Sequence, residues 1–187
     1  MKEDMNKAFE VLNTGGTILY PTDTIWGIGC DATNQEAVKH IYDIKHREDN
    51  KSMLVLLGSA NQLLQYVEYV PDIAWDLIEL ADKPLTIIYP RAKNLAKNLV
   101  SSDGTIGIRI VQDEFCRKLL ERFKKPIVST SANISGEKAP GIFKDISQDI
   151  ITAVDYVVSW RQNDNTRYKP SGIIKLGTSG EVEVIRE

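Results

Sequence analysis

The sequence predicts a single α/β domain whose central sheet is twisted and mixed and is flanked by helices. A chain of 187 residues is long enough for one domain with its own hydrophobic core. Apolar segments typical of strands alternate with segments of helical periodicity along the whole chain. The final strands follow one another without helices between them, so parallel and antiparallel pairs are expected together. Because no linker divides the chain, residues 1–187 are predicted to form one domain.

The N-terminal half is expected to begin with a helix that ends at two glycines, followed by a strand that Pro21 stops. The segment PTDTIWGIG, which starts at Pro21, is expected to be a loop. Thr33 with Glu36, and Ser59 with Gln62, form capping boxes that predict where later helices start. In order, the expected elements are a helix over 5–13, a strand over 17–20, a helix from 33, a strand over 53–57, and helices over 63–67 and 71–81.

The C-terminal half contains most of the predicted strands. Alternation within residues 105–111 places Ile106, Ile108 and Ile110 on one face, so Arg109 points to the opposite face. A polar connection over 161–171 precedes the last two strands and is a candidate flap. In order, the expected elements are strands over 85–89 and 105–111, a helix over 115–123, and strands over 126–130, 156–158, 172–176 and 182–185.

Composition excludes several classes of protein. A net charge of -3 argues against a protein that coats nucleic acid through global positive charge, but is compatible with a local basic cleft. Cys30 and Cys116 lie far apart, which favours buried thiols in a reducing compartment over a disulfide framework or a zinc site. His40 and His46 are expected at the surface. The N-terminus lacks the apolar run of a signal peptide, so a cytoplasmic protein is predicted.

Three polar clusters are candidates for binding an anionic substrate: residues 22–24, 45–51 and 129–133. The first offers hydroxyls and a carboxylate near Gly27 and Gly29, whose missing side chains would let backbone N–H groups approach a ligand. A proline-initiated turn explains the same residues equally well. The third carries three hydroxyls and an amide after an apolar strand, which is more than a turn needs and favours a ligand loop.

The second cluster places Lys45 and Arg47 at the end of a predicted helix. Cations there compensate the helix dipole, but together they could also bind a polyphosphate, with Lys51 as a third contact. Motifs of the types GxxxxGK[ST], GxGxxG and GxSxG are all missing from the sequence. A Walker-type phosphate loop, a Rossmann dinucleotide site and a serine hydrolase triad are therefore not indicated.

Four separated motifs, PTDTIWGIG, K-H-R, TIGIRI and STSANISG, occur in this order along the chain. Their order and spacing resemble those of the YrdC-like family of threonylcarbamoyl-AMP synthases, and the resemblance covers nearly the whole chain. The K-x-R signature of that family falls on Lys45 and Arg47, and its S-x-N signature falls on Ser131 and Asn133. The resemblance implies a YrdC-like fold in its short form, without the extra C-terminal domain of longer members.

The resemblance also implies a nucleotidyltransferase that makes threonylcarbamoyl-AMP and pyrophosphate from L-threonine, bicarbonate and ATP, with Mg²⁺ accompanying ATP. Partner proteins would transfer the threonylcarbamoyl group to an adenosine of certain tRNAs, giving threonylcarbamoyladenosine. The implied threonine contacts are Thr24, Arg109 and Ser131. The implied ATP contacts are Lys45, Arg47, Lys51, Thr105, Asn133 and Arg186. The implied catalytic residues are Lys45, Arg47, Ser131 and Asn133, and Asp23 is a candidate outer-sphere partner of the Mg²⁺.

The residue types suit this chemistry, because a carbamate and ATP are both anionic and cations must offset their repulsion. The sequence departs from the family pattern at three places: Lys51 stands where relatives often carry Asn, Gly141 where they offer a hydroxyl, and Gly172 where Thr often follows Ser. Two other interpretations stay open. One is a non-catalytic module that binds double-stranded RNA or tRNA with the same cationic concave surface. The other is a HypF-like carbamoylation domain.

Overall fold

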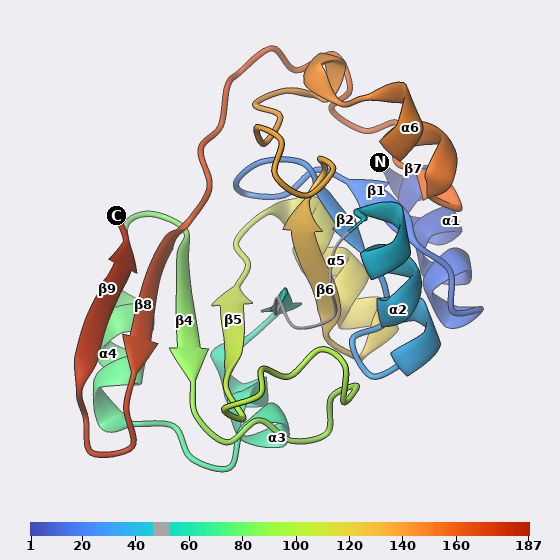
Figure 1. Ribbon diagram of the computed structural model, residues 1–187. Coiled ribbons are helices and arrows are strands. Elements are labelled where there is room, and N and C mark those ends of the chain that lie inside the picture. Colours follow the sequence, from blue (N-terminus) through green and yellow to red (C-terminus); the bar gives the residue numbers. More distant parts are fainter. Residues whose placement is uncertain (47–52) are drawn as a thin grey trace.

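The computed structural model describes residues 1–46 and 53–187, and it contains one nine-stranded mixed sheet flanked by helices (Figure 1). The predicted mixed α/β fold is confirmed. The strands are β1 (Ile18–Tyr20), β2 (Gly27–Gly29), β3 (Leu54–Leu57), β4 (Leu85–Tyr89), β5 (Ile106–Ile110), β6 (Ile127–Ser131), β7 (Tyr156–Val157), β8 (Gly172–Leu176) and β9 (Val182–Arg186). The α-helices are α1 (Lys2–Asn13), α2 (Gln35–Ile44), α3 (Leu63–Tyr66), α4 (Asp72–Leu80), α5 (Glu114–Phe123) and α6 (Gln148–Ala153).

The strands lie in the order β7-β1-β2-β6-β3-β5-β4-β8-β9. The pairs β1–β7, β3–β5 and β4–β8 are parallel, and the remaining neighbours are antiparallel. Strands from both halves of the chain alternate across the sheet, so β5 lies beside β3 and β4, and the last strand β9 forms one edge. This order brings segments that are remote in sequence, such as β5 and β9, to the same half of the sheet (Figure 1).

The two faces of the sheet carry separate hydrophobic cores. The larger core packs α2, α3 and α4 against inward residues such as Val55 and Ile108, and the smaller core packs α1 and α5 against Tyr20, Leu56 and Ile127. Each fully buried Leu or Ile contributes about 1.5–3 kcal/mol, so these cores fix the orientation of every central strand. The smaller core includes no residue of β4 or β8 among the residues that the structure describes. The packing of α1 and α5 therefore does not extend over these strands.

Strand β2 was not predicted, because PTDTIWGIG has the composition of a loop. The prediction is wrong for its last three residues, which pair with β1 and β6. A Cβ on Gly29 would lie 2.5 Å from the carbonyl oxygen of Val128 and 2.7 Å from a ring carbon of Tyr20. Gly29 therefore allows close packing inside the sheet.

Helix α2 begins one residue later than the capping box predicts. The Asn34 side chain accepts hydrogen bonds from the backbone N–H groups of Glu36 and Ala37, at 3.0 and 3.1 Å. Thr33 instead donates its hydroxyl to the Asp31 carboxylate at 2.6 Å. The prediction of Thr33 as the cap is wrong because the amide oxygen of Asn34, one residue later, accepts the hydrogen bonds of the first helical turn.

The Ser59 cap is confirmed, but on a short 3₁₀ turn. Its hydroxyl accepts from the N–H of Asn61 at 3.3 Å, while the Gln62 side chain accepts from the N–H of Gly58 at 3.2 Å. Pro71 precedes α4 as its N-cap instead of forming its first helical residue. The short helix α6 was not predicted, since six residues give too little periodicity to recognise.

The connection between β7 and β8 runs across the top of the molecule in Figure 1. It is anchored by Arg161, whose Nη1 donates to the carbonyl of Thr22 at 3.1 Å and to the Asp113 carboxylate at 3.0 Å. Further along, the N–H of Tyr168 donates to the carbonyl of Gly141 at 3.3 Å. The connection is thus hydrogen-bonded to the segments that follow β1, β5 and β6.

The predicted burial of the two cysteines and the predicted exposure of the two histidines are confirmed. Cys30 and Cys116 are free and buried, and burial raises the pKa of both thiols. His40 and His46 are exposed. Over residues 1–46 and 53–187, no helix has the length and apolar character needed to cross a membrane.

Candidate active site

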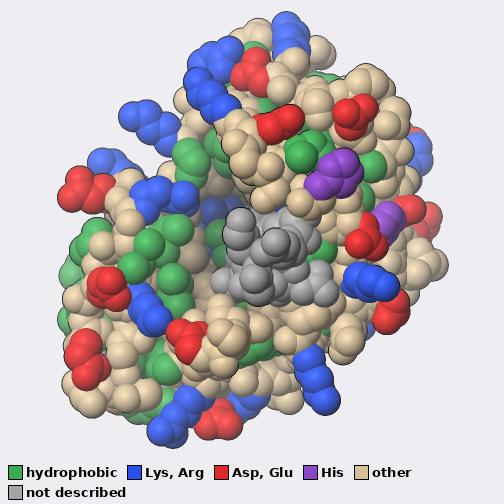
Figure 2. Space-filling model, in the orientation of Figure 1, with side chains coloured by type: hydrophobic (Ala, Val, Ile, Leu, Met, Phe, Trp, Pro, Cys, Tyr) green, Lys and Arg blue, Asp and Glu red, His purple; other side chains and the backbone are tan. Residues whose placement is uncertain are grey.

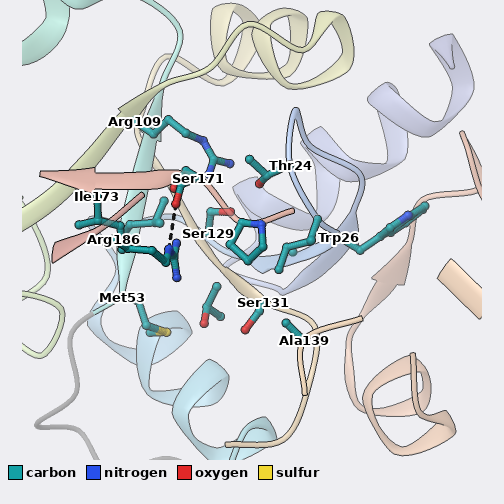
Figure 3. A pocket seen from close by; sticks show the side chains of 15 residues that line it. Thr24, Trp26, Met53, Arg109, Ser129, Ser131, Ala139, Ser171, Ile173 and Arg186 are labelled. Carbon is teal, nitrogen blue, oxygen red and sulfur yellow. Dashed lines mark hydrogen bonds between the residues drawn. The ribbon is translucent and has the colours of Figure 1, made fainter. Parts of the chain in front are cut away.

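A cavity of about 290 Å³ opens on the same face of the sheet as α1 and α5, beside the strands that these helices cover (Figure 3). Its polar wall consists of two guanidinium groups and a set of hydroxyls, and its apolar wall includes Trp26, Met53 and Ile173. The polar side chains are those of Arg109, Arg186, Thr24, Ser129, Thr130, Ser131 and Ser171. No acidic side chain occurs among the described residues that line it. Figure 2 shows the hollow on this face, with basic side chains along its edge.

Arg109 comes from the middle of β5, as the predicted alternation requires. Its cross-strand partners are Leu56 and Thr86, so all three side chains lie on the same face of the sheet. The Arg109 side chain is only 3% exposed, and its Nη2 lies 3.1 Å from Oδ1 of Asp23. The buried Nε of Arg109 has no hydrogen-bond partner within residues 1–46 and 53–187. Donor capacity is therefore left on a cation that lines the cavity.

The segment after β1 forms a network of hydroxyl groups beside Arg109. The Thr22 hydroxyl lies 3.0 Å from that of Thr24, donates to the carbonyl of Ile25 at 2.8 Å, and accepts from the N–H of Thr24 at 3.0 Å. Arg109 Nη2 also reaches the Thr22 hydroxyl at 3.5 Å. The interpretation of this segment as a turn with internal hydrogen bonds is confirmed, and the turn holds Thr24 at the cavity wall.

Ser131 ends strand β6 at the cavity, and Asn133 follows in the loop. The Asn133 amide nitrogen donates to the carbonyls of Ile134 and Glu137, each at 2.9 Å. Its Oδ1 is buried without a hydrogen-bond partner among the described atoms. Asn133 does not line the main cavity, so the structure places its side chain in the loop that supports Ser131.

Lys45, directly after α2, lies behind this loop instead of at the cavity surface. The side chain is 1% exposed, and its Nζ donates to the carbonyls of Ser131 and Asn133 at 2.5 and 2.6 Å. The N–H of Ser135 donates to the carbonyl of Lys45 at 2.9 Å. The ammonium group therefore holds the 131–135 loop in place while its charge lies close to the site.

Arg186, from the edge strand β9, lines the same cavity, and Figure 3 shows its side chain on the same side of the view as Arg109 and Ser171. Its Nε donates to the carbonyl of Ser171 at 2.9 Å. Burial, and then the nearby positive charge of Arg109, lower the pKa of Arg186. The guanidinium groups of Arg109 and Arg186 repel each other, and both line one hollow. An anion with more than one negative charge would offset this repulsion.

Ser171 is a polar cavity residue that the sequence analysis did not name as a site residue, and apolar lining residues such as Met53 and Ile173 were not named either. Its hydroxyl lies 2.8 Å from that of Thr86 on β4, and both side chains are buried. The only sequence signal was its place between a polar connection and a strand, which is typical of a site but does not identify a residue.

Thr105 lines a second cavity of about 490 Å³ with Asp103 and Lys175. Met53, Leu54 and Ile173 line both this cavity and the first one, so the two cavities adjoin, and together they are called the groove below. Thr105 donates its hydroxyl to Asp103 at 2.7 Å, and this bond lowers the pKa of Asp103, assisted by Lys175. The two cavities together offer room for more than one small molecule.

Asp23 and Gly141, which the sequence analysis also named, are not among the described residues that line the main cavity. Arg47 and Lys51 lie outside the described residues. Asp23 has its Oδ1 beside Arg109 and accepts from the N–H of Gln112 through Oδ2 at 3.2 Å, so both oxygens face protein groups. Gly141 lies beside Arg167, in a hollow that adjoins the main cavity. In the part of the chain that is described, no cluster of three or more acidic, His or Cys side chains could hold a metal ion.

An α/β sheet with guanidinium groups and hydroxyls around one groove defines a protein that binds small anionic molecules. The chain belongs to the Sua5–YciO–YrdC family, whose model carries the description "Telomere recombination" and matches residues 10–187.

Two curated relatives cover most of this chain. The threonylcarbamoyl-AMP synthase of Pseudoalteromonas translucida is 34% identical over 178 residues, which are 94% of this chain and 94% of that protein. A putative threonylcarbamoyl-AMP synthase of Methanocaldococcus jannaschii is 36% identical over 168 residues, 89% of this chain and 77% of that protein.

Solved structures share the fold. YciO of Escherichia coli has a TM-score of 0.85 at 25% identity, covering 100% of this chain and 90% of that one. Sua5 of Pyrococcus abyssi, solved in complex with L-threonine, has a TM-score of 0.82 at 24% identity. The match covers 92% of this chain but only 50% of the Sua5 chain, which is therefore much longer.

Proposed function

We propose that the protein is a threonylcarbamoyl-AMP synthase, which joins L-threonine, bicarbonate and ATP and releases pyrophosphate. The observation that carries the proposal is the convergence of Arg109 and Arg186 on one cavity rimmed by hydroxyls. Curated relatives with this name, 34% and 36% identical to the chain, support it. The family match over residues 10–187 agrees with this assignment.

The reaction needs two bond-forming steps. The first joins threonine to bicarbonate, and the second joins their product to ATP. The amine of threonine combines with bicarbonate to give a carbamate, with loss of water. A carbamate oxygen then attacks the α-phosphorus of ATP, and pyrophosphate leaves with the electron pair of the broken P–O bond. No covalent enzyme intermediate is needed, so positioning and charge compensation are what the protein must supply. Magnesium would enter as part of the ATP substrate.

The residues divide between threonine and ATP. Arg109 would bind the threonine carboxylate, with Thr24 and Ser131 as hydroxyl contacts at the same wall. Arg186 and Thr105 would contact the nucleotide along the groove. Asn133 would contact ATP from the 131–135 loop, and Lys45 would place its charge behind that loop. Arg47 and Lys51 would contact phosphate from the segment outside the described residues.

A role for Asp23 as an outer-sphere magnesium partner fits the geometry poorly, because both carboxylate oxygens already face Arg109 and Gln112. We therefore do not include Asp23 among the groups that contact Mg·ATP.

We also infer the cellular setting. Two buried free cysteines are compatible with a reducing cytoplasm. One sheet contains strands from both ends of the chain, which supports residues 1–187 acting as one domain. Transfer of the threonylcarbamoyl group to tRNA would require partner proteins, since a cavity of about 290 Å³ fits small substrates but not a nucleotide inside a folded RNA.

The RNA-binding module is the weaker interpretation. RNA recognition relies on extended basic surfaces and on stacked aromatics, whereas here the cations converge inside a small hollow and the chain has a net charge of -3. The curated relatives carry an enzyme name. HypF structures share the fold with TM-scores of 0.78 and 0.82, but 20% identity shows the fold alone.

The direct test incubates the purified protein with ATP, bicarbonate, threonine and Mg²⁺ and follows the adenylate by mass spectrometry and pyrophosphate by a coupled assay. Product is expected only when all four are present, and with threonine in preference to glycine. Failure to form the adenylate under these conditions, with a folded protein, would refute the proposal.

A further inference from the structure

Arg109 is a buried cation that must remain in place when the cavity contains no carboxylate. Its side chain is 3% exposed and comes from a central strand, so the charge is largely removed from water. A second guanidinium, that of Arg186, lines the same cavity and makes the local charge still less favourable. A buried charge without a partner is strongly destabilising, and a guanidinium that is not held can rotate away from its productive position.

Asp23 supplies the compensating charge. Its carboxylate is 11% exposed and lies 3.1 Å from Nη2 of Arg109, yet the two atoms are not aligned for a hydrogen bond. Asp23 therefore attracts the guanidinium group of Arg109 but does not take up all of its N–H donors. An incoming carboxylate can then form better-aligned bonds to Arg109 without first having to remove a tightly bound competitor.

The position of Asp23 is itself fixed from the strand that carries Arg109. Asp23 Oδ2 accepts from the N–H of Gln112, which lies two residues after the end of β5. The two oxygens thus have separate tasks: one faces the guanidinium and the other is bonded to the backbone. Figure 3 shows the Arg109 side chain reaching toward Thr24 at the cavity wall, whereas Asp23 does not line the cavity.

We propose that Asp23 is a positioning residue, which holds the Arg109 guanidinium so that it receives the α-carboxylate of threonine. The inference rests on the proposed function, because it takes threonine as the ligand of Arg109. It assigns no contact between Asp23 and any substrate. We expect a larger effect on threonine recognition than on ATP binding, because Asp23 faces Arg109, whereas Arg186 is held by the carbonyl of Ser171.

The discriminating variant is Asp23→Asn. An amide has one acceptor oxygen where the carboxylate has two, so either the bond from Gln112 or the attraction to Arg109 is lost. The KM for threonine is expected to rise by about tenfold or more, corresponding to loss of one charge-assisted interaction, while the KM for ATP changes by less than about twofold. Asp23→Glu retains both acceptor oxygens and should lie between the wild type and Asp23→Asn.

Asp31→Asn is the matched control. Asp31 is also buried, with 6% side-chain exposure, and pairs with Lys125 at 2.6 Å, but it lies outside the cavity. This variant should lose thermal stability and keep the wild-type KM for threonine. Calorimetric titration with L-threonine gives a second measurement that does not depend on turnover, and Asp23→Asn should bind threonine about tenfold more weakly there as well.

The outcomes separate the inference from the proposed function. If the wild type makes the adenylate but Asp23→Asn has an unchanged KM for threonine, or equal losses for threonine and ATP, the positioning role is refuted. If Asp23→Asn does not fold, Asp23→Glu is measured in its place. It must then raise the KM for threonine more than the KM for ATP. If the wild type binds threonine but makes no adenylate, only the proposed function fails, and the binding titration still decides the role of Asp23. If the wild type binds no threonine, both are refuted.

Discussion

The ammonium group of Lys45 donates to the carbonyl oxygen of Ser131 at 2.5 Å, from a side chain that is 1% exposed. A second bond, 2.6 Å long, reaches the carbonyl of Asn133. The K-x-R lysine is thus bonded to the backbone of the S-x-N segment. Two motifs that lie about ninety residues apart in the chain are joined into one unit, at the point where β6 enters the cavity.

Replacing this lysine tests that connection. Lys45→Met nearly keeps the length of the side chain but removes the ammonium donor from the carbonyls of Ser131 and Asn133, of which that of Ser131 still accepts from the N–H of Asn133. The free energy of unfolding should therefore fall by about 1–3 kcal/mol. Adenylate formation should fall by at least about tenfold, because Ser131 is no longer held at the cavity wall. Urea unfolding and steady-state kinetics measure the two effects.

Lys39→Met is the control for that variant, since Lys39 is an exposed lysine on the same helix α2. It should change neither stability nor activity. Full activity in Lys45→Met would show that the 131–135 loop keeps its position without the ammonium group.

The sequence predicted eight of the nine strands because each has either β-branched alternation or a continuous apolar run. It failed at β2, where glycine is required by the close approach of Val128 and Tyr20, a tertiary contact that leaves no local pattern. In the site, alternation correctly placed Arg109 away from the isoleucine face. The local sequence could not show that Lys45 is bonded to loop carbonyls. A lysine at the end of a helix is explained equally well by compensation of the helix dipole and by phosphate binding, and neither explanation involves the loop.

Arg186 offers a test of the nucleotide end of the groove. Arg186→Gln removes a guanidinium that lines the cavity and that is held by the carbonyl of Ser171. The KM for ATP should rise by about tenfold, as expected for loss of one charge-assisted contact, while the KM for threonine changes much less. Arg122→Gln removes the same charge from the exposed side of α5 and should leave both constants unchanged. An unchanged KM for ATP in Arg186→Gln would remove Arg186 from the proposed nucleotide contacts.

Gly29 is expected to resist substitution for reasons of packing. Gly29→Ala would place a Cβ 2.5 Å from the Val128 carbonyl oxygen, so β2 and β6 would have to separate. The free energy of unfolding should fall by about 1–3 kcal/mol, as in other overpacked cores. Gly58→Ala is the matched control, because its nearest neighbour, Leu120 Cβ, lies at an ordinary 3.5 Å. Equal urea midpoints for the two variants would contradict the close approach.

The stability of the N-terminal helix should depend on pH through Asp4. Burial alone would raise the pKa of Asp4, but bonds from the Ser159 N–H and the Tyr156 hydroxyl, together with the charge of the N-terminal amine, lower it below 3.8. A carboxyl with a lowered folded pKa stabilises the protein fully above its unfolded pKa. That stabilisation is lost as the pH falls through the folded pKa.

Asp4→Asn isolates the charge. Both hydrogen bonds reach Oδ1, which the amide can keep, so only the ionic part of the interaction disappears. The free energy of unfolding at pH 7 should fall by about 1 kcal/mol, because neutral hydrogen bonds are roughly half as strong as charge-assisted ones. Below about pH 4 the difference from the wild type should shrink, as the wild-type carboxyl itself becomes protonated. Asp72→Asn controls for the helix dipole, because Asp72 is an exposed acid in the first turn of α4, and it should not reproduce this convergence. Denaturant unfolding between pH 3 and pH 7 measures both, and a difference from the wild type that stays constant across that range would show that Asp4 is not stabilised in its ionised form.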